Sequence, residues 1–140
     1  MTEQVSIKAA GPDGRRETVR LTHSDQPPYA ITLHRAAGGD ETYEGSNLFV
    51  CLTELRKELE RDGLLLCCQG ARGDVTPSGL ESQMTGGRYV YTFTPGERQV
   101  NQEYVDIFAP AAYEDVVTVA EQRAAVLAFH GLPDTGWEPR

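Results

Sequence analysis

The fold of this chain is decided by residues 47–62, which read NLFVCLTELRKELERD. Apolar residues recur there every three or four positions, which is the spacing of one face of an α-helix; they are Leu48, Cys51, Leu52, Leu55 and Leu59. The charged residues fall on the other side of the helix, at Glu54, Arg56, Lys57, Glu58 and Arg61. Ser46 or Asn47 can cap the first turn, and Gly63 stands where a left-handed residue ends a helix. We therefore predict a helix over Asn47–Asp62 whose apolar face packs on a sheet.

Three strands are predicted before this helix. Apolar and polar residues alternate over Gln4–Ala9 and over Glu17–Thr22, and the intervening Gly11-Pro12-Asp13-Gly14 is a strong turn signal. The alternation resumes over Tyr29–Leu33. This pattern predicts three antiparallel strands, and we expect the polar, acidic segment Ala36–Gly45 to form a loop.

Three further strands are predicted after the helix. Leu64–Cys68 is apolar at every position, which is typical of a central strand covered on both faces. Arg88–Thr94 is rich in β-branched and aromatic residues, and Val105–Phe108 is predicted as a short strand that Pro110 ends.

A second, shorter helix is predicted over Val119–Phe129, where Thr118 and Glu121 have the spacing of a capping box. The strands precede and straddle the helices without a regular βαβ alternation, so the expected class is α+β. We expect one domain in which a mainly antiparallel, five- to six-stranded sheet packs against one long helix and a shorter C-terminal helix. It divides into the N-terminal strands (1–45), the remaining elements (46–131) and a tail (132–140).

The composition limits the possible partners. The chain has 140 residues, a net charge of −8, 39% hydrophobic residues and 24% charged residues, as in ordinary globular domains. Its acidity disfavours binding to nucleic acid or to an anionic membrane, and it attracts cationic partners. The start Met1-Thr2-Glu3-Gln4 lacks the basic and apolar regions of a secretory signal. We expect a cytoplasmic protein.

The three cysteines, Cys51, Cys67 and Cys68, are expected to pack in the core. An odd number argues against a disulfide framework. Cys67 and Cys68 are adjacent, so their side chains point to opposite faces of a strand and do not suit one metal ion. We predict no metal site and no cofactor.

A glycine- and arginine-rich loop over residues 69–88 is the main candidate for a binding site. Arg72, Ser78 and Arg88 could converge on one anion, because guanidinium groups bind carboxylate or phosphate with two hydrogen bonds. We take Arg72, Asp74, Ser78 and Arg88 as candidate binding residues. The alternative interpretation is a local ion pair between Arg72 and Asp74, in a loop whose glycines only make turns.

No catalytic residue is assigned. The serine in Pro77-Ser78-Gly79 lacks the G-x-S-x-G pattern of a nucleophile elbow. The histidines His23, His34 and His130 lie in different segments and have no marked acidic neighbour. A triad stays possible in principle, because its geometry does not follow sequence order.

A set of spaced motifs in the chain comprises Leu55-Arg56, Leu59-Glu60, Gly63, Cys68, Gly70-Ala71-Arg72, Asp74-Val75, Pro77-Ser78-Gly79, Met84, Gly86-Gly87-Arg88 and Tyr91. These motifs resemble the pattern of a family of small, uncharacterised bacterial proteins of actinobacterial type. The resemblance extends over Leu48–Gln122, with Leu80 where the family pattern has methionine. It implies no catalytic residue and no ligand.

These observations favour a non-catalytic, acidic binding module of the bacterial cytoplasm, such as an immunity or accessory protein of a conflict system. The expected partner is a basic protein, because an acidic inhibitor can present carboxylates to a cationic toxin site. The alternatives are a small-anion or small-molecule binding domain, or a small enzyme, with its site in the loop 69–88. Monomer and homodimer stay equally open.

Overall fold

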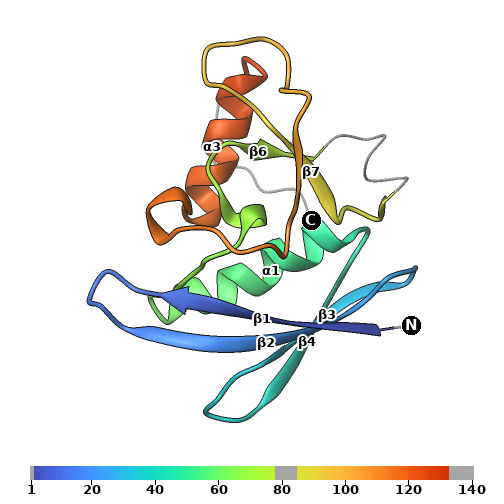
Figure 1. Cartoon of the computed structure of the whole chain (residues 1–140), viewed down its shortest axis with the longest axis vertical. Helices are drawn as coiled ribbons and strands as arrows, with labels where there is room; N and C mark the ends of the chain where they lie inside the picture. Colours follow the sequence, from blue (N-terminus) through green and yellow to red (C-terminus); the bar gives the residue numbers. More distant parts are fainter. Residues whose placement is uncertain (1, 78–84, 133–140) are drawn as a thin grey trace.

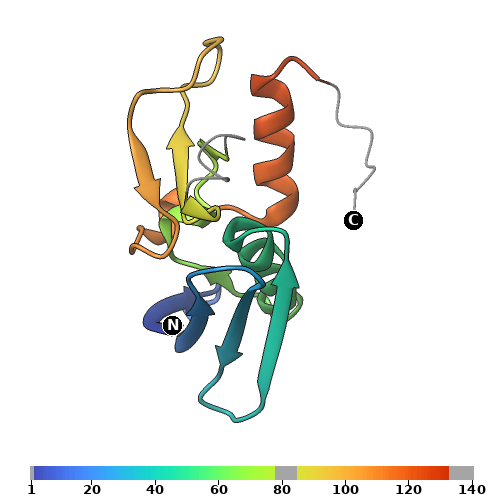
Figure 2. The same cartoon turned by 90° about the vertical axis from the view of Figure 1, so that its right-hand side faces the viewer.

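The computed structural model describes residues 2–77 and 85–132. Ser78 and nearly all of the predicted tail lie outside these residues. The described part has a five-stranded sheet on one side and a smaller sheet with a helix on the other (Figures 1 and 2). The long helix α1 (Leu48–Arg61) lies between the two halves.

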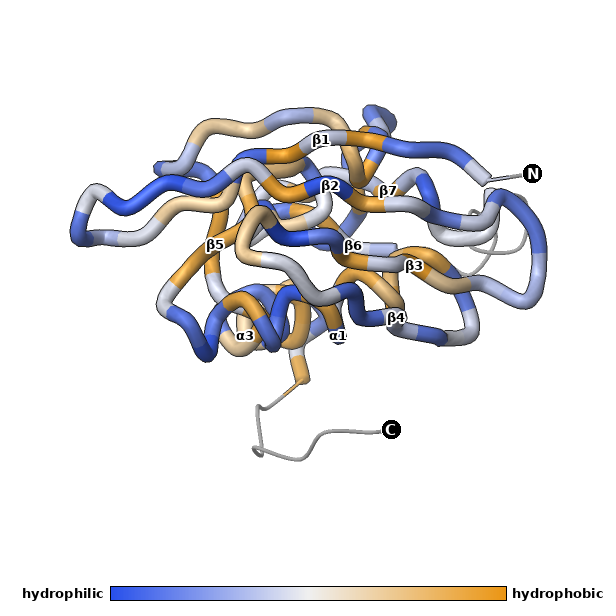
Figure 3. The backbone as a smooth tube through the Cα atoms, turned by 90° about the horizontal axis from the view of Figure 1, so that it is seen from below, coloured by the Kyte–Doolittle hydropathy of each residue, from blue (hydrophilic) through white to orange (hydrophobic). Residues whose placement is uncertain are grey.

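The five-stranded sheet is antiparallel, with strand order β4-β3-β2-β1-β5. Its strands are β1 (Thr2–Ala10), β2 (Arg16–Ser24), β3 (Tyr29–His34), β4 (Asp40–Gly45) and β5 (Leu65–Leu66). The predicted hairpin and third strand are confirmed, and Ile7 of β1 pairs with Val19 of β2. Hydrophobic and hydrophilic positions alternate along β1 and β2, so one face of the sheet is apolar (Figure 3).

The predicted loop over Ala36–Gly45 is wrong in its second half, where β4 pairs with β3. This strand forms one edge of the sheet, and its carboxylate residues Asp40, Glu41 and Glu44 are exposed. Charged side chains are common on edge strands because they discourage pairing with other chains. The acidic composition therefore belongs to a solvated edge strand.

The strand predicted over Leu64–Cys68 is present in a shorter form, but its predicted central position in the sheet is wrong. β5 contains only Leu65 and Leu66, and it pairs with the last two residues of β1 at the edge of the sheet. The chain then leaves the sheet, and Cys68 forms an isolated bridge with Pro110. Leu64 and Leu66 are buried, and α1 packs against β5.

Helix α1 forms as the sequence predicts. The side chain of Asn47 accepts a hydrogen bond from the backbone N–H of Val50, at 2.9 Å, and so caps the helix. Gly63 follows the end of the helix with φ of 77°, a value that favours glycine. The apolar stripe on α1 is fully buried against the sheet, with Cys51, Leu52, Leu55 and Leu59 each at 0% exposure.

The other half contains a three-stranded antiparallel sheet and the helix α3 (Val119–Phe129). Its strands are β6 (Val75–Thr76), β7 (Tyr89–Thr92) and β8 (Tyr104–Asp106), and two single 3-10 turns, η1 (Gln69–Ala71) and η2 (Tyr113–Asp115), connect them to the rest. α3 begins at the predicted capping box of Thr118 and Glu121. The strands predicted after α1 exist with shorter bounds, but β7 and β8 belong to this second sheet.

The predicted α+β class, with one long helix and a shorter C-terminal helix in a single domain, is confirmed. In the part of the chain that the structure describes, no helix is long and apolar enough to cross a membrane.

Arg56 departs from the predicted polar face of α1, because it is only 1% exposed. Its guanidinium donates to the side-chain oxygen of Gln122 at 2.6 Å and to the carbonyl of Val117 at 2.8 Å. The side-chain amide of Gln122 in turn donates to the carbonyls of Gly70 and Arg72, both at 2.9 Å. This buried network joins α1, the start of α3 and the turn η1.

Leu55→Ala should lower the free energy of unfolding by about 2–5 kcal/mol, because it opens a cavity under the fully buried face of α1. Val50→Ala on the exposed side of the same helix is the control and should change it by less than about 0.5 kcal/mol. Urea denaturation measures both. Equal effects would contradict the position of the helix on the sheet.

Arg56→Ala and Gln122→Ala should each destabilise the protein by about 1–3 kcal/mol, because each leaves a buried hydrogen-bonding group without its partner. The double variant should lose less than the sum, since the second substitution removes a group that is already unpaired. Urea denaturation of the wild type, the two single variants and the double variant measures the coupling free energy between the two side chains. Strictly additive losses would show that the two side chains act independently.

Candidate functional site

Arg72 and Asp74, two of the four candidate binding residues, form a local ion pair. Nε and Nη2 of Arg72 donate to the two carboxylate oxygens of Asp74 at 2.9 and 2.7 Å. Nη1 donates to the side-chain oxygen of Gln69 at 2.7 Å. The hydrogen bonds with Asp74 raise the pKa of the Arg72 guanidinium. The arrangement is the local pair that the sequence offered as the alternative to an anion site.

Arg88 lies in a different cluster with its own carboxylates. It donates to Asp106 through Nη2 at 3.2 Å and pairs with Glu3 at the start of β1. Its guanidinium carbon lies 5.7 Å from the centre of the Phe108 ring, within the range of a cation–π contact. Burial opposes the charged form of Arg88, but its hydrogen bonds and charge interactions with Asp106 and Glu3 outweigh this and raise its pKa.

The structure thus brings Arg72 and Asp74 together but gives Arg88 a separate set of partners, and Ser78 lies outside the described residues. Glycines of the loop make close contacts. A Cβ atom on Gly70 would lie 2.7 Å from the side chain of Leu52, and one on Gly87 would lie 2.7 Å from the side chain of Asn47. These glycines let the loop pack closely against α1.

A hydroxyl, an imidazole and a carboxylate line up on the outer face of the five-stranded sheet. Oγ1 of Thr22 lies 2.9 Å from Nε2 of His34, whose Nδ1 lies 3.0 Å from Oδ1 of Asp40. Hydrolase triads use the same order of groups. Here the groups come from β2, β3 and β4, where neighbouring backbone N–H groups pair within the strand ladders. Acyl transfer also needs a hollow and free N–H donors for an oxyanion, and the described residues show neither beside these three groups.

The edge of β1 that faces β5 is mostly unpaired in the described residues. The carbonyl of Lys8 accepts from the backbone N–H of Cys67 at 2.8 Å, and Ala9 and Ala10 pair with β5. In an antiparallel ladder, alternate residues direct both backbone groups to the same neighbour. Gln4 and Ser6 therefore direct their N–H and C=O groups to the same side as Lys8, where no described strand pairs with them.

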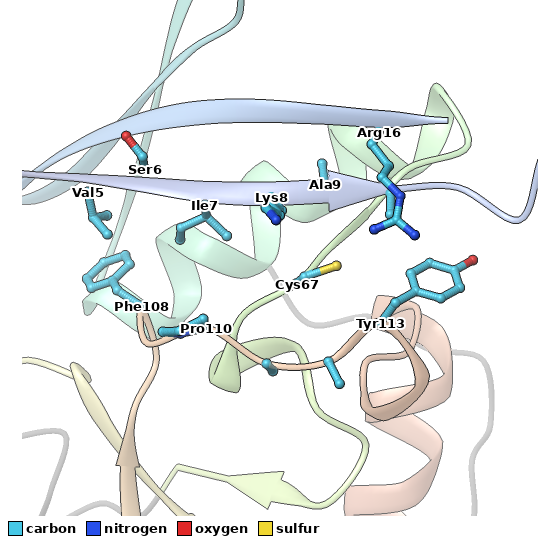
Figure 4. Close-up of a pocket in the computed structure, with 13 residues that line it drawn as sticks. Val5, Ser6, Ile7, Lys8, Ala9, Arg16, Cys67, Phe108, Pro110 and Tyr113 are labelled. Carbon is cyan, nitrogen blue, oxygen red and sulfur yellow. The ribbon is translucent and has the colours of Figure 1, made fainter. Parts of the chain in front are cut away.

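A groove of about 460 Å³ lies between this edge and the chain segment 108–113 (Figure 4). We call it the β1 groove. At one end it is lined by apolar side chains, Val5, Ile7, Phe108 and Pro110. The volume is within the range of pockets that bind ligands.

The other end of the β1 groove is cationic and is closed by the chain. Lys8, Arg16, Cys67 and Tyr113 line it, and Figure 4 shows the Arg16 side chain bending past the end of β1 toward Cys67 and Tyr113. Within the described residues neither Lys8 nor Arg16 forms an ion pair. Burial raises the pKa of the Cys67 thiol, against the opposing effect of the two cations. This thiol is therefore protonated at neutral pH.

A second, more apolar groove of about 390 Å³ runs between α1 and α3. Pro77 is one of its lining residues. Among the described residues no group of three or more histidine, cysteine, aspartate or glutamate side chains is placed to hold a metal ion.

Comparison with known protein families and with curated proteins gave no match to this chain. The resemblance described above therefore rests on the sequence pattern alone. The structure adds what sequence reasoning missed, which is the β1 groove. The alternation in β1 identifies Val5 and Ile7 as inward-facing, but no sequence signal shows where β5 stops.

Arg88→Ala should lower the free energy of unfolding by about 1 kcal/mol, because it leaves Glu3 and Asp106 without their common cation. The exposed Arg98→Ala, with the same change of charge, should have almost no effect.

If Arg72 and Arg88 serve only their carboxylates, millimolar inorganic phosphate should not raise the Tm of the wild-type protein. A rise in Tm that Arg72→Ala or Arg88→Ala abolishes would support an anion site instead.

Proposed function

We propose that this protein is a non-catalytic binding module, which takes up an extended segment of a partner protein along the unpaired edge of β1. The observation that carries the proposal is that no described strand pairs with the outward backbone groups of Gln4 and Ser6, and that Ser6 lines the β1 groove. An added strand would form backbone hydrogen bonds with these groups, and its alternate side chains would enter the groove.

The charge distribution supports a protein partner. The net charge of −8 would steer a basic partner toward the molecule from a distance. Such a role fits an immunity or accessory protein of a bacterial conflict system. A catalytic role has weaker support, because in the described residues the hydroxyl–imidazole–carboxylate set lies on an open sheet face.

Ser6→Pro tests the proposal, because it removes an N–H that points away from β2 and so leaves the β1–β2 ladder complete. Ser6→Ala keeps the N–H and is the matched control. A library of random linear peptides with free carboxyl termini is selected on the wild-type protein. The selected peptides should bind Ser6→Ala like wild type and Ser6→Pro about tenfold or more weakly, a loss of about 1.4 kcal/mol.

Hydrogen exchange with the best peptide bound should show new protection at the amides of Gln4 and Ser6. Far-ultraviolet circular dichroism and the Tm of the free variants confirm that Ser6→Pro is folded. Failure to select any peptide, or peptides that bind Ser6→Pro as well as wild type, would overturn the proposal.

A further inference from the structure

The β1 groove is open at one end and closed at the other. At the start of β1, none of the described strands lies beside Gln4 and Ser6 on the side away from β2. The carbonyl of Lys8 already accepts a hydrogen bond from the backbone N–H of Cys67. The next two residues, Ala9 and Ala10, pair with β5. A peptide strand that pairs with Gln4 and Ser6 cannot continue along β1 beyond Lys8. It must turn away there or end there.

The charges at the closed end of the groove favour one terminus of a peptide over the other. Lys8 and Arg16 both line the groove at this point, and neither has an ion-pair partner among the described residues. Two neighbouring cations at this end of the groove repel an amino terminus and attract a carboxylate. The guanidinium of Arg16 also has the geometry to hold both oxygens of a carboxylate.

On the basis of the proposed function, we infer that the β1 groove recognises the carboxyl terminus of its partner, with the terminal carboxylate bound by Arg16 and Lys8. The carboxylate lies at the Lys8 end and the rest of the peptide extends toward Gln4. The bound peptide therefore runs parallel to β1. Its apolar side chains pack against Val5, Ile7 and Phe108.

The test compares two forms of the best peptide from the selection, one with a free carboxyl terminus and one with a terminal amide. Wild-type protein should bind the free acid about tenfold or more tightly than the amide. Arg16→Gln should lose most of this preference, and Lys8→Gln should reduce it. The preference should also decrease at high salt.

Arg20→Gln is the matched control. Arg20 lies on β2 on the same sheet face as Arg16 and is exposed, but it does not line the groove. Its substitution makes the same change of net charge and should keep the preference for the free acid. If Arg20→Gln reduced the preference as much as Arg16→Gln does, the effect would be general electrostatics and the inference would be overturned.

The direction of the peptide is tested separately with a nitroxide label at its amino terminus. NMR resonances of residues near Gln4 should broaden more than those of residues near Lys8. The reverse pattern would overturn the inference. If the acid and the amide bind equally well but both lose affinity to Ser6→Pro, the inference fails while the proposed function stands. If no peptide binds, both fail.

Discussion

The buried hydrogen bonds of Arg56 constrain the rest of this structure. A guanidinium that is 1% exposed requires acceptors, because a buried charge without partners is strongly unfavourable. Burial lowers the pKa of Arg56, and the charge of nearby Glu60 acts in the opposite direction. The acceptors are Gln122 and the carbonyl of Val117, so α3 meets α1 at this point. Glu60, one turn further along α1, accepts a hydrogen bond from the N–H of Val119 at the start of α3.

The same network shapes the β1 groove. Gln122 holds the carbonyls of Gly70 and Arg72, so the chain that follows β5 is drawn toward α3 and away from the sheet. β5 therefore ends after two residues. Had this segment continued along β1, it would have paired with Ser6 and Gln4 and filled the edge. The open edge is a consequence of the way the two halves are joined.

The two edges of the five-stranded sheet differ in their side chains and surroundings. β4 carries the exposed carboxylates of Asp40, Glu41 and Glu44, which discourage pairing with another chain. β1 is a nine-residue strand whose free edge at Gln4 and Ser6 borders a groove with an apolar end. A long strand edge beside an apolar hollow is a template for strand addition. This difference is why we propose β1 as the binding edge. The charges on β4 oppose pairing with another strand.

The sequence by itself determined the local elements of this protein: the hairpin, the third strand, α1 with a cap at Ser46 or Asn47, and α3 with its capping box. These depend on residue spacing and on cap and turn chemistry, which act over a few residues. Tertiary structure decided which elements are neighbours, and so it decided the second sheet, the edge position of β4, the shortness of β5 and the burial of Arg56. In the sequence, Arg56 looks like any other charged residue on a helix face. Its hydrogen-bond acceptors belong to residues more than sixty positions away, so only the folded chain brings them to it. The β1 groove has the same origin, because the end of a strand depends on what competes for its backbone hydrogen bonds.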